Sequence, residues 1–555
     1  MLTAWRPPVE RSTMNAVSEG NAVQLVLDGE NFFRALEDLL DTVAKAEPGP
    51  DTYVRLAYWE ISQDLRLPSG TTLVPKLKGV ADQGHPVDLI MWCPARLDVR
   101  FDKNMSAGIL AVNEKTAAQV GRYDSKNKKR PDGRIRCLLE VYNGWNGSSV
   151  HQKIALFSVA GKLTALIGGL NLANFYWDNE AHDGDEGGGM GEPPLENTVH
   201  DTALLLRGPG AVDIETEWLR RWQKRFYEVG TLTGQAGRAT SPISDPTEYD
   251  ELPRARRDEQ LHKSQKVSVQ IATTNSESYL GRSTDIQSLL VEEIRKAQDS
   301  IYFEGFAFSD PTLVTELVAR LKKPRPPKVC VMVPYPYKGN PFPFDYLNYI
   351  SFAKLSLAGC THVTVAGKRV ARDDCSVWKI NESLNAWSTL RSITSMVSNT
   401  WLEKDSFTFH PQGGTSTTVP LLSLEGFEGD RVRFLAPFHG DTAIYIHSKL
   451  ALFDDRVAVV GSANFTYRSM VYDGELSAFI RDEASARSIR DALYGHYVDG
   501  YNPTKCAWIA DSRYVRARKE DVPSRAHGLV ALTVNDFPRV LPDDPSYKKI
   551  NHTFI

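Results

Sequence analysis

The chain has 555 residues and an ordinary globular composition, because 42% of the residues are hydrophobic and 24% are charged. A chain of this length suits two or more domains, or one large double domain. The net charge of −4 excludes an overall basic footprint for nucleic acid, so a nucleic-acid partner is not expected, although a local basic cleft stays open.

Cysteine spacing and hydropathy exclude further classes of protein. The six cysteines are far apart and form no CxxC pair, which argues against a zinc site built on cysteines and against a disulfide-built scaffold. The N-terminal stretch MLTAWRPPVERSTMNAVSEG lacks the apolar h-region of a Sec signal peptide. The sequence contains no apolar run of about 18 residues, so no transmembrane helix is predicted. The compartment stays open between the cytoplasm and export by a specialised secretion system.

Strands and helices alternate through the first half of the chain. The polar residues 1–20 are expected to form a flexible tail. Apolar residues then recur at helical spacing from Phe32 to Val43, which predicts an amphipathic helix. The other elements predicted in this half are strands at Ala22–Leu27, Tyr53–Trp59, Val87–Cys93, Ile135–Tyr142 and Ala203–Arg207, and a helix at Val212–Val229. This order is typical of βαβ units, in which helices cover the faces of a sheet.

Glycine, serine, proline and charged residues at 231–265 predict a linker, after which the pattern starts again. The segment IYFEGFAFSDPTL resembles VRLAYWEISQDLRL of the first half, which predicts an internal duplication and two related lobes. The predicted boundaries are a first lobe at 21–230, a second lobe at 266–510 with an insertion at 367–440, and a tail at 511–555. The elements predicted in the second lobe are strands at Ser300–Phe306 and Val329–Val333 and helices at Pro311–Leu321 and Ala484–Tyr497. The insertion either carries substrate contacts or is an ordinary surface elaboration.

The stretch Ile446–Met470 holds the pattern H-x-K-x4-D-x6-G-S-x-N. A strand predicted at Tyr445–Phe453 points residues i and i+2 to one face, so His447 and Lys449 are expected to project together. Lysine neutralises the anionic oxygens of a phosphate ester, and histidine titrates near working pH. Asp454 follows the histidine by an odd number of residues, which places it on the opposite face and favours a structural role.

A copy of this pattern begins at His151 in VHQKIALF, where Lys153 has the same spacing and Ser158 stands in the place of the aspartate. Small residues after each hairpin let the backbone approach a ligand, and asparagine amides donate to phosphate oxygens. The residues that match in this way are Gly169 and Asn171 in the first copy and Ser462 and Asn464 in the second.

An acidic residue follows each copy just before an apolar strand: Asp201 in HDTALLL and Glu475 in DGELSAFI. Such a carboxylate accepts the second N–H of an imidazole and fixes its tautomer and orientation. We expect each acid to orient the histidine of its own copy, so Glu475 is the candidate for His447.

Two copies around one pocket would supply two histidines, two lysines and two asparagines if the lobes pack by a pseudo-twofold. One histidine could attack phosphorus and form a covalent phosphohistidine. The other could protonate the leaving alcohol and then activate water or an acceptor alcohol. The lysines and asparagines carry the charge stabilisation, so the pattern predicts no metal and no cofactor.

The duplicated pattern resembles the His-Lys-Asp motif of the phospholipase D superfamily. HSKLALFDDRVAVVGSANFTYRS matches closely, and HQKIALFSVAGKLTALIGGLN matches except at Ser158. The likeness continues through VHDTALLLRGPGAVDIETEWLRRW and covers most of residues 21–500. The resemblance implies an α/β fold of two similar α/β/α sandwich lobes related by pseudo-twofold symmetry, with the active site at the lobe interface.

The resemblance also implies a role for each residue of the two motifs. His151 would be the nucleophile and His447 the general acid and base, Lys153, Lys449, Asn171 and Asn464 would bind phosphate, and Asp201 and Glu475 would orient the histidines. The implied activity is hydrolysis of phosphatidylcholine-like lipids to phosphatidic acid, often with transphosphatidylation. We expect a monomer that meets its phospholipid substrate peripherally, at the membrane surface.

Two other interpretations stay open. A nuclease or a phosphatidyl-transferring synthase shares the phosphodiester chemistry, although the acidic balance weighs against nucleic acid and the lack of a predicted transmembrane helix weighs against a membrane-embedded synthase. A non-catalytic phospholipid-binding protein is motivated by Ser158, but strand parity places the missing carboxylate off the catalytic face, so activity is expected to survive. The aromatic run 175–177 either lines a headgroup pocket or packs in the core.

Overall fold

A computed structural model of the chain describes residues 16–93, 105–120, 123–124, 126, 133–141, 148–182, 198–231, 252–260, 266–276, 282–336, 344–365, 367–371, 379–380, 406–409, 417–420 and 423–537. Most of the expected N-terminal tail, the end of the expected C-terminal tail and much of the expected insertion lie outside these residues. Within the described part of the chain, no helix combines the length and the hydropathy that a membrane span requires.

The first half forms a mixed sheet with the strand order β1-β9-β7-β6-β2-β3-β5-β4. The ladders among β2, β3 and β5 are parallel, as βαβ connections require, whereas β6, β7 and β9 pair antiparallel. The strands are β1 (Val17–Leu27), β2 (Tyr53–Tyr58), β3 (Val87–Cys93), β4 (Tyr123–Asp124), β5 (Arg134–Val141), β6 (Ile154–Val159), β7 (Lys162–Gly168) and β9 (Thr202–Arg207). The helices are α1 (Asp28–Lys45), α2 (Leu73–Asp82), α4 (Met105–Val120), η2 (Asn174–Tyr176) and α5 (Pro209–Thr231).

The second half forms a sheet with the order β10-β25-β24-β23-β12-β13-β20-β27-β26. Its strands are β10 (Val267–Asn275), β12 (Ser300–Glu304), β13 (Lys328–Met332), β20 (Val432–His439), β23 (Leu450–Phe453), β24 (Val457–Gly461), β25 (Glu475–Ile480), β26 (Val515–Arg516) and β27 (His527–Ala531). The helices are α6 (Asp285–Lys296), α7 (Pro311–Leu321), α8 (Phe344–Gly359), α9 (Tyr467–Val471) and α10 (Glu483–Tyr497). Smaller elements are η4 (Asp258–Gln260), β11 (Ser283–Thr284), β14 (His362–Val365), β15 (Lys368–Ala371), β16 (Lys379–Ile380), β17 (Ser406–Phe409), β18 (Thr417–Pro420), β19 (Leu424–Glu428), β21 (Thr442–Ala443) and η10 (Lys519–Asp521).

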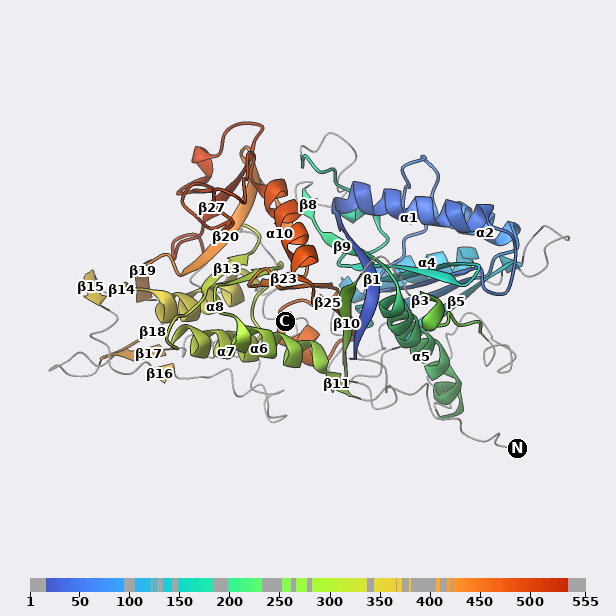
Figure 1. Ribbon diagram of the computed structural model, residues 1–555, viewed down its shortest axis with the longest axis horizontal. Coiled ribbons are helices and arrows are strands. Elements are labelled where there is room, and N and C mark those ends of the chain that lie inside the picture. The colour runs from blue at the N-terminus through green and yellow to red at the C-terminus, as the bar shows by residue number, and fades with distance from the viewer. Residues whose placement is uncertain are drawn as a thin grey trace.

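The two sheets are joined through the first strand of the chain. The start of β1 pairs antiparallel with β10 of the second half, and its remainder pairs with β9 of the first half. Asn21 lies at the change of partner, where its amide donates to the Val267 carbonyl at 3.0 Å and accepts the Gly210 N–H at 2.8 Å. In Figure 1, β1 and β10 accordingly lie between the first half on the right and the second half on the left.

The strand orders of the two halves repeat each other. The run β9-β7-β6-β2-β3-β5 of the first half corresponds to β25-β24-β23-β12-β13-β20 of the second, with the same parallel and antiparallel ladders. The predicted mixed α/β class is therefore confirmed. The pseudo-twofold axis and the lobe boundaries at 21–230 and 266–510 stay predictions.

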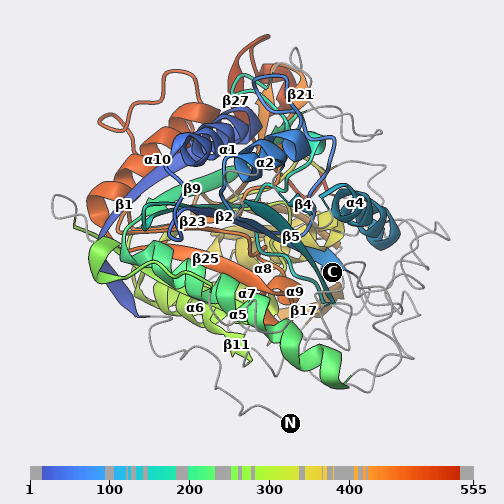
Figure 2. The same cartoon turned by 90° about the vertical axis from the view of Figure 1, so that its right-hand side faces the viewer.

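Helices cover both faces of the sheets, and Figure 2 shows α1 and α2 above the strands and α5 below them. The stripe Phe32, Leu36 and Leu40 of α1 is fully buried in the outer core of the first half, as the helical spacing predicted. The helices α5 and α10 pack in another core, which also contains strands of both sheets. The two halves therefore share one buried apolar core.

Three stretches are more deeply integrated than the sequence indicated. The strand β20 falls inside the expected insertion, yet it pairs with β13 in the main sheet, and β27 of the expected tail pairs with β20. Residues 252–260 of the expected linker pack on the first half, where the Ala255 N–H donates to Glu215 at 3.0 Å and Gln260 accepts the Leu163 N–H at 2.9 Å. Their ladder and packing partners are distant in sequence, so the local composition did not indicate them.

Candidate active site

Two parallel backbone contacts connect the halves beside the predicted catalytic histidines. The short strands β8 (Val199–His200) and β22 (Tyr445–Ile446) pair with each other, and the His447 N–H then donates to the His200 carbonyl at 2.8 Å. In the same way Val150 bridges to Gly474, and the His151 N–H donates to the Gly474 carbonyl at 2.9 Å. Each histidine is thus fixed next to the residue that precedes the acid of the other half.

The histidine–carboxylate pairs are consequently crossed between the halves. His151 Nδ1 lies 2.9 Å from Glu475 Oε1, and His447 Nδ1 lies 2.6 Å from Asp201 Oδ2. The expectation that each acid orients the histidine of its own copy was wrong. In the first sheet β7 lies between β6, which follows His151, and β9, which follows Asp201. In the second sheet β24 lies in the same way between β23 and β25. Two strand spacings, about 10 Å, therefore separate each acid from the histidine of its own copy.

The predicted strand 445–453 is interrupted at residues 447–449, because β22 belongs to the contact between halves and β23 to the main sheet. His447 and Lys449 still lie together, with Lys449 Nζ 3.1 Å from His447 Nδ1. In the first half Lys153 Nζ donates to the His151 carbonyl at 2.8 Å. The histidine side chains are 13% and 12% exposed, whereas both lysines are 2% exposed, so a ligand reaches the imidazoles first.

Burial and the clustered positive charges keep both imidazoles neutral. Burial, with the charge of Lys153 adding to it, holds the pKa of His151 well below its ordinary value. Burial, with Lys449 adding to it, lowers the pKa of His447 to about 3, although Asp201 opposes this shift. Each lysine also acts on the histidine of the other half, so the four residues form one electrostatic cluster. A neutral imidazole whose Nδ1–H is held by a carboxylate presents the Nε2 lone pair, as a nucleophile requires.

Burial also shifts the pKa values of the two lysines and of Glu475. Burial lowers the pKa of Lys153 to about 7 and that of Lys449 to about 8, although Glu475 opposes both shifts. Burial raises the pKa of Glu475 to about 7, against the charge of Lys153. Burial would also raise the pKa of Asp201, but His447 and Lys449 outweigh it and hold that pKa below its usual value.

We expect kcat/KM to fall as the pH rises through about 7 to 8, the pKa values of Lys153 and Lys449. A lysine is charged below its pKa and neutral above it, and a neutral lysine no longer stabilises phosphate oxygens. Since kcat/KM reports groups of the free enzyme, its pH profile on a soluble phosphodiester measures this loss directly. Lys449→Arg should move the alkaline limb upward, because arginine keeps its charge throughout this range. A profile that stays flat up to about pH 9 would contradict the assignment.

The residues Gly169 and Ser462 contact the acids. A Cβ on Gly169 would lie 2.1 Å from Asp201 Oδ1, so only glycine leaves room for this carboxylate. At the matching position Ser462 Oγ donates to Glu475 Oε2 at 2.5 Å. These two residues, predicted to let a phosphate approach, thus support the acids that hold the histidines.

The two predicted phosphate-binding asparagines are buried, Asn171 fully and Asn464 at 8% exposure. The Asn171 amide donates to the Tyr176 hydroxyl at 2.8 Å. The Oδ1 atoms of both asparagines have no hydrogen-bond partner within the described part of the chain. Their contact with phosphate stays a prediction.

Four residues near the histidines were not predicted as site residues from the sequence, although one of them, Tyr176, belongs to the aromatic run 175–177. The Trp59 ring lies 5.8 Å from that of His151, and the Phe306 ring lies 6.0 Å from that of His447. Both follow corresponding strands, so the duplicated segment that contains them was the available signal. Tyr176 of the run 175–177 is buried in the core of the first half, and its ring lies 5.1 Å from that of His447. Burial raises the pKa of the Glu60 carboxyl to about 7, although the nearby charge of Lys153 opposes this shift.

Asp454 and Ser158 lie at the ends of their hairpins, away from the histidines. The Asp454 carboxylate accepts the backbone N–H groups of Gln298, Asp299 and Ser300 at 2.7 to 2.9 Å, just before β12. The Ser158 hydroxyl donates to the Asp51 carbonyl at 2.6 Å, just before β2. Both side chains therefore attach a hairpin to the segment that precedes the neighbouring strand. Asp454 does so as a hydrogen-bond acceptor and Ser158 as a donor.

We expect Asp454→Ala to lower the free energy of unfolding by about 1–3 kcal/mol, because three backbone N–H groups lose a charged acceptor. The kcat of the folded protein should stay within about twofold, since the carboxylate is remote from the histidines. Urea unfolding and steady-state kinetics measure the two effects. The matched control is Arg456→Ala, which removes an exposed partner of the same carboxylate and should cost about 0–1 kcal/mol. A large loss of kcat with unchanged stability would contradict a structural role for Asp454.

Comparison with known proteins extends these observations. The model of a protein family described as the PLD-like domain of cardiolipin synthase matches residues 421–495, which include His447, Lys449 and Glu475. The predicted resemblance to the phospholipase D superfamily is therefore confirmed by similarity to proteins of that superfamily. The chain is 30% identical over 82 residues to a cardiolipin synthase of Staphylococcus aureus, which is 15% of this chain and 16% of that protein. It is 46% identical over 56 residues to cardiolipin synthase 2 of Staphylococcus epidermidis, which is 10% of this chain and 11% of that protein.

Two solved structures align over most of the chain. One is a phosphatidylserine synthase from Haemophilus influenzae Rd KW20, with a TM-score of 0.41, 10% identity, and 84% of this chain and 85% of that chain covered. The other is a polyphosphate kinase from Porphyromonas gingivalis, with a TM-score of 0.38, 14% identity, and 86% of this chain and 51% of that chain covered. The matches to the staphylococcal synthases span less than a fifth of those proteins.

Proposed function

We propose that this protein is a phospholipase D-type phosphodiesterase that hydrolyses glycerophospholipids to phosphatidic acid and the free headgroup. The observation that carries the proposal is the cluster of two neutral histidines, each held at Nδ1 by a buried carboxylate of the other half, with two buried lysines beside them. Two imidazoles held at Nδ1 and two cations beside them suit in-line displacement at an anionic phosphodiester. One chain carries both histidines, so we infer a monomer that acts at the membrane surface.

In the proposed first step, His151 Nε2 attacks phosphorus and the bond from phosphorus to the headgroup oxygen breaks. His447 gives its proton to that oxygen, which leaves as the free alcohol. In the free protein His447 is neutral, so it takes up this proton when the phosphate anion enters and favours the imidazolium. Glu475 holds the nucleophile and offsets the positive charge that develops on the phosphohistidine.

In the proposed second step, His447 removes a proton from water, which attacks the phosphohistidine and releases phosphatidic acid. Lys153 and Lys449 stabilise the charge on the phosphate oxygens in both steps, and Asp201 stabilises the imidazolium of His447. Asn171 and Asn464 are proposed to donate to the same oxygens. The residues at 158 and 454 take no part in these steps.

A second candidate is transfer of the phosphatidyl group to an acceptor alcohol in place of water. The match of residues 421–495 to a cardiolipin synthase domain favours it. The chemistry is the same until the second step, where His447 would deprotonate an alcohol. The choice depends on what occupies the site beside the phosphohistidine.

The test measures headgroup release from vesicles of phosphatidylcholine, phosphatidylethanolamine and phosphatidylglycerol, with and without added glycerol. Phosphatidic acid as the main product supports hydrolysis, and a new phosphatidyl ester that grows with glycerol supports transfer. Headgroup release that persists in both His151→Ala and His447→Ala would exclude the proposed site. A parallel assay on plasmid DNA separates the nuclease alternative, which predicts nicking that the same substitutions abolish. Lipid binding without turnover would favour the non-catalytic alternative.

A further inference from the structure

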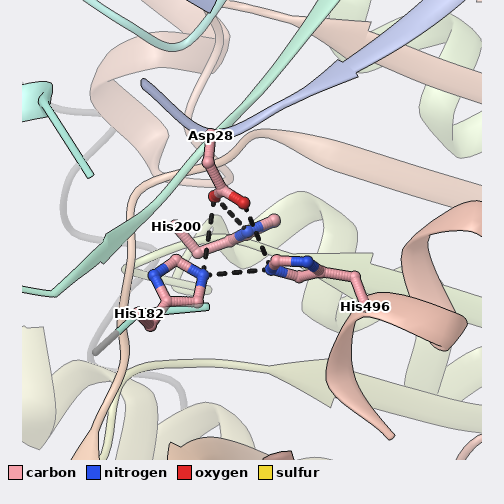
Figure 3. A group of neighbouring side chains, drawn as sticks. All are labelled: Asp28, His182, His200 and His496. Atoms are coloured by element: carbon pink, nitrogen blue, oxygen red, sulfur yellow. Dashed lines mark hydrogen bonds and ion pairs between the residues drawn. The ribbon is translucent and has the colours of Figure 1, made fainter. Parts of the chain in front are cut away.

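A second group of buried ionisable side chains lies behind the catalytic acid Asp201. Three imidazoles and one carboxylate converge there, as Figure 3 shows, and we name Asp28, His182, His200 and His496 the histidine cluster. Their exposures are 0%, 1%, 0% and 6%. They come from the start of α1, the segment after η2, β8 and α10, so both halves of the chain contribute.

The distances within the histidine cluster lie on either side of the separation between ligand atoms in a tetrahedral metal site. His496 Nε2 lies 3.0 Å from His182 Nε2 and 3.2 Å from Asp28 Oδ2. Asp28 Oδ1 lies 3.6 Å from His182 Nε2 and 2.7 Å from His200 Nδ1. With Zn–N bonds of about 2.0–2.1 Å, neighbouring ligand atoms of a tetrahedral site lie about 3.3 Å apart. One ligand atom from each residue lies within 4.8 Å of all the others.

The orientation of His182 is fixed by a carboxylate outside the cluster. His182 Nδ1 lies 2.7 Å from Asp178 Oδ2, which also accepts the Val199 N–H at 2.8 Å. Since Nδ1 donates to the carboxylate, Nε2 presents a lone pair to the centre of the cluster. Zinc-binding histidines are oriented by carboxylates in this way. His496 Nε2 faces this lone pair at 3.0 Å, a separation that requires a proton or a cation.

The histidine cluster is held mainly by ion-pair contacts, and several of its polar atoms have no well-directed hydrogen bond to any described residue. Within the described part of the chain, Asp28 Oδ2, His200 Nδ1 and His496 Nδ1 have no hydrogen bond of acceptable geometry. Two further buried carboxylates border the cluster, Asp178 and Glu304, whose Oε1 lies 3.2 Å from His200 Nε2. Burying carboxylates and polar atoms without well-directed hydrogen bonds is costly, and a divalent cation would offset the charge and bind the inward-facing atoms.

We propose that Asp28, His182, His200 and His496 bind one structural Zn²⁺ ion. Three imidazole nitrogens and one carboxylate oxygen are a donor set that zinc accepts in tetrahedral geometry, and four protein ligands leave no open position for water. The ion would crosslink α10 of the second half to three segments of the first. The ion would also help to fix the positions of Asp201 and His447. The Asp28 N–H donates to the Asp201 carbonyl at 2.9 Å, and the His200 carbonyl accepts the His447 N–H at 2.8 Å.

The test begins with the metal content of the whole chain, purified without a histidine tag and without chelator, and measured by inductively coupled plasma mass spectrometry. We expect about one Zn²⁺ per chain, and about one Co²⁺ after exchange, with the visible absorption of tetrahedral cobalt. His182→Ala and His496→Ala should each lose most of the bound metal. The matched control is His527→Ala, since this histidine lies beside the cluster but contacts the Ala181 carbonyl, and it should retain the metal.

The midpoint temperature of thermal unfolding tests the proposal on the wild-type protein, without any variant. Chelation of the wild-type protein should lower the midpoint by several degrees, and added Zn²⁺ should restore it. A wild-type chain that is purified without metal and takes up neither Zn²⁺ nor Co²⁺ on dialysis would overturn the proposal in favour of a hydrogen-bonded histidine network. Equal metal loss in the His182, His496 and His527 variants would overturn the assignment of the ligands.

Discussion

His151→Ala and His447→Ala should each reduce kcat on a natural phospholipid by on the order of 10⁴-fold or more, because both steps of the proposed reaction need both imidazoles. The two variants should differ on a p-nitrophenyl phosphodiester, whose leaving group needs no proton. His447→Ala should then still form the phosphohistidine and release one equivalent of nitrophenol in a burst. His151→Ala should give no burst, because it lacks the nucleophile. Stopped-flow absorbance and acid-quench labelling measure the two outcomes.

The control for these variants is His362→Ala, since this histidine lies on the peripheral strand β14 and contacts Glu428 and Arg369. Its kcat should equal that of the wild type. A burst in His151→Ala and none in His447→Ala would reverse the proposed roles of the two histidines. Bursts in both variants would mean that neither imidazole is the nucleophile.

Asp201→Asn and Glu475→Gln should each lower kcat by about 10²–10⁴-fold, because each leaves an imidazole without the carboxylate that fixes its tautomer. The crossed pairing predicts which step each change affects. Asp201→Asn should behave as His447→Ala, with a burst and slow release of the phosphohistidine, since Asp201 contacts His447. Glu475→Gln should instead slow formation of the phosphohistidine, since Glu475 contacts His151.

Double variants provide the control for this pairing. Asp201→Asn should add little to His447→Ala, and Glu475→Gln should add little to His151→Ala, because residues that act as a unit are not additive. The opposite pattern, in which Asp201→Asn slows the first step, would mean that each acid serves the histidine of its own copy. Unfolding curves check that each single variant remains folded.

Much of the fold was predictable because its signals are local. The helix Pro311–Leu321 and the strand Val87–Cys93 have the predicted bounds, since apolar spacing and flanking breakers report on neighbouring residues. The duplicated pattern likewise identified the histidines, lysines and acids that the structure brings together. By contrast, the strand 445–453 was predicted as continuous, because nothing local indicates that Tyr445–Ile446 pairs with the other half.

The sequence alone predicted which residues should carry the chemistry, because each motif places its histidine and lysine two residues apart on one short segment. Only the tertiary structure decided how the two motifs combine. The contacts of His151 with Gly474 and of His447 with His200 join segments far apart in the chain, and these contacts cross the carboxylates between the halves. The histidine cluster has the same origin, since packing of α10 against the first half brings its ligands together and no spacing in the sequence indicates it.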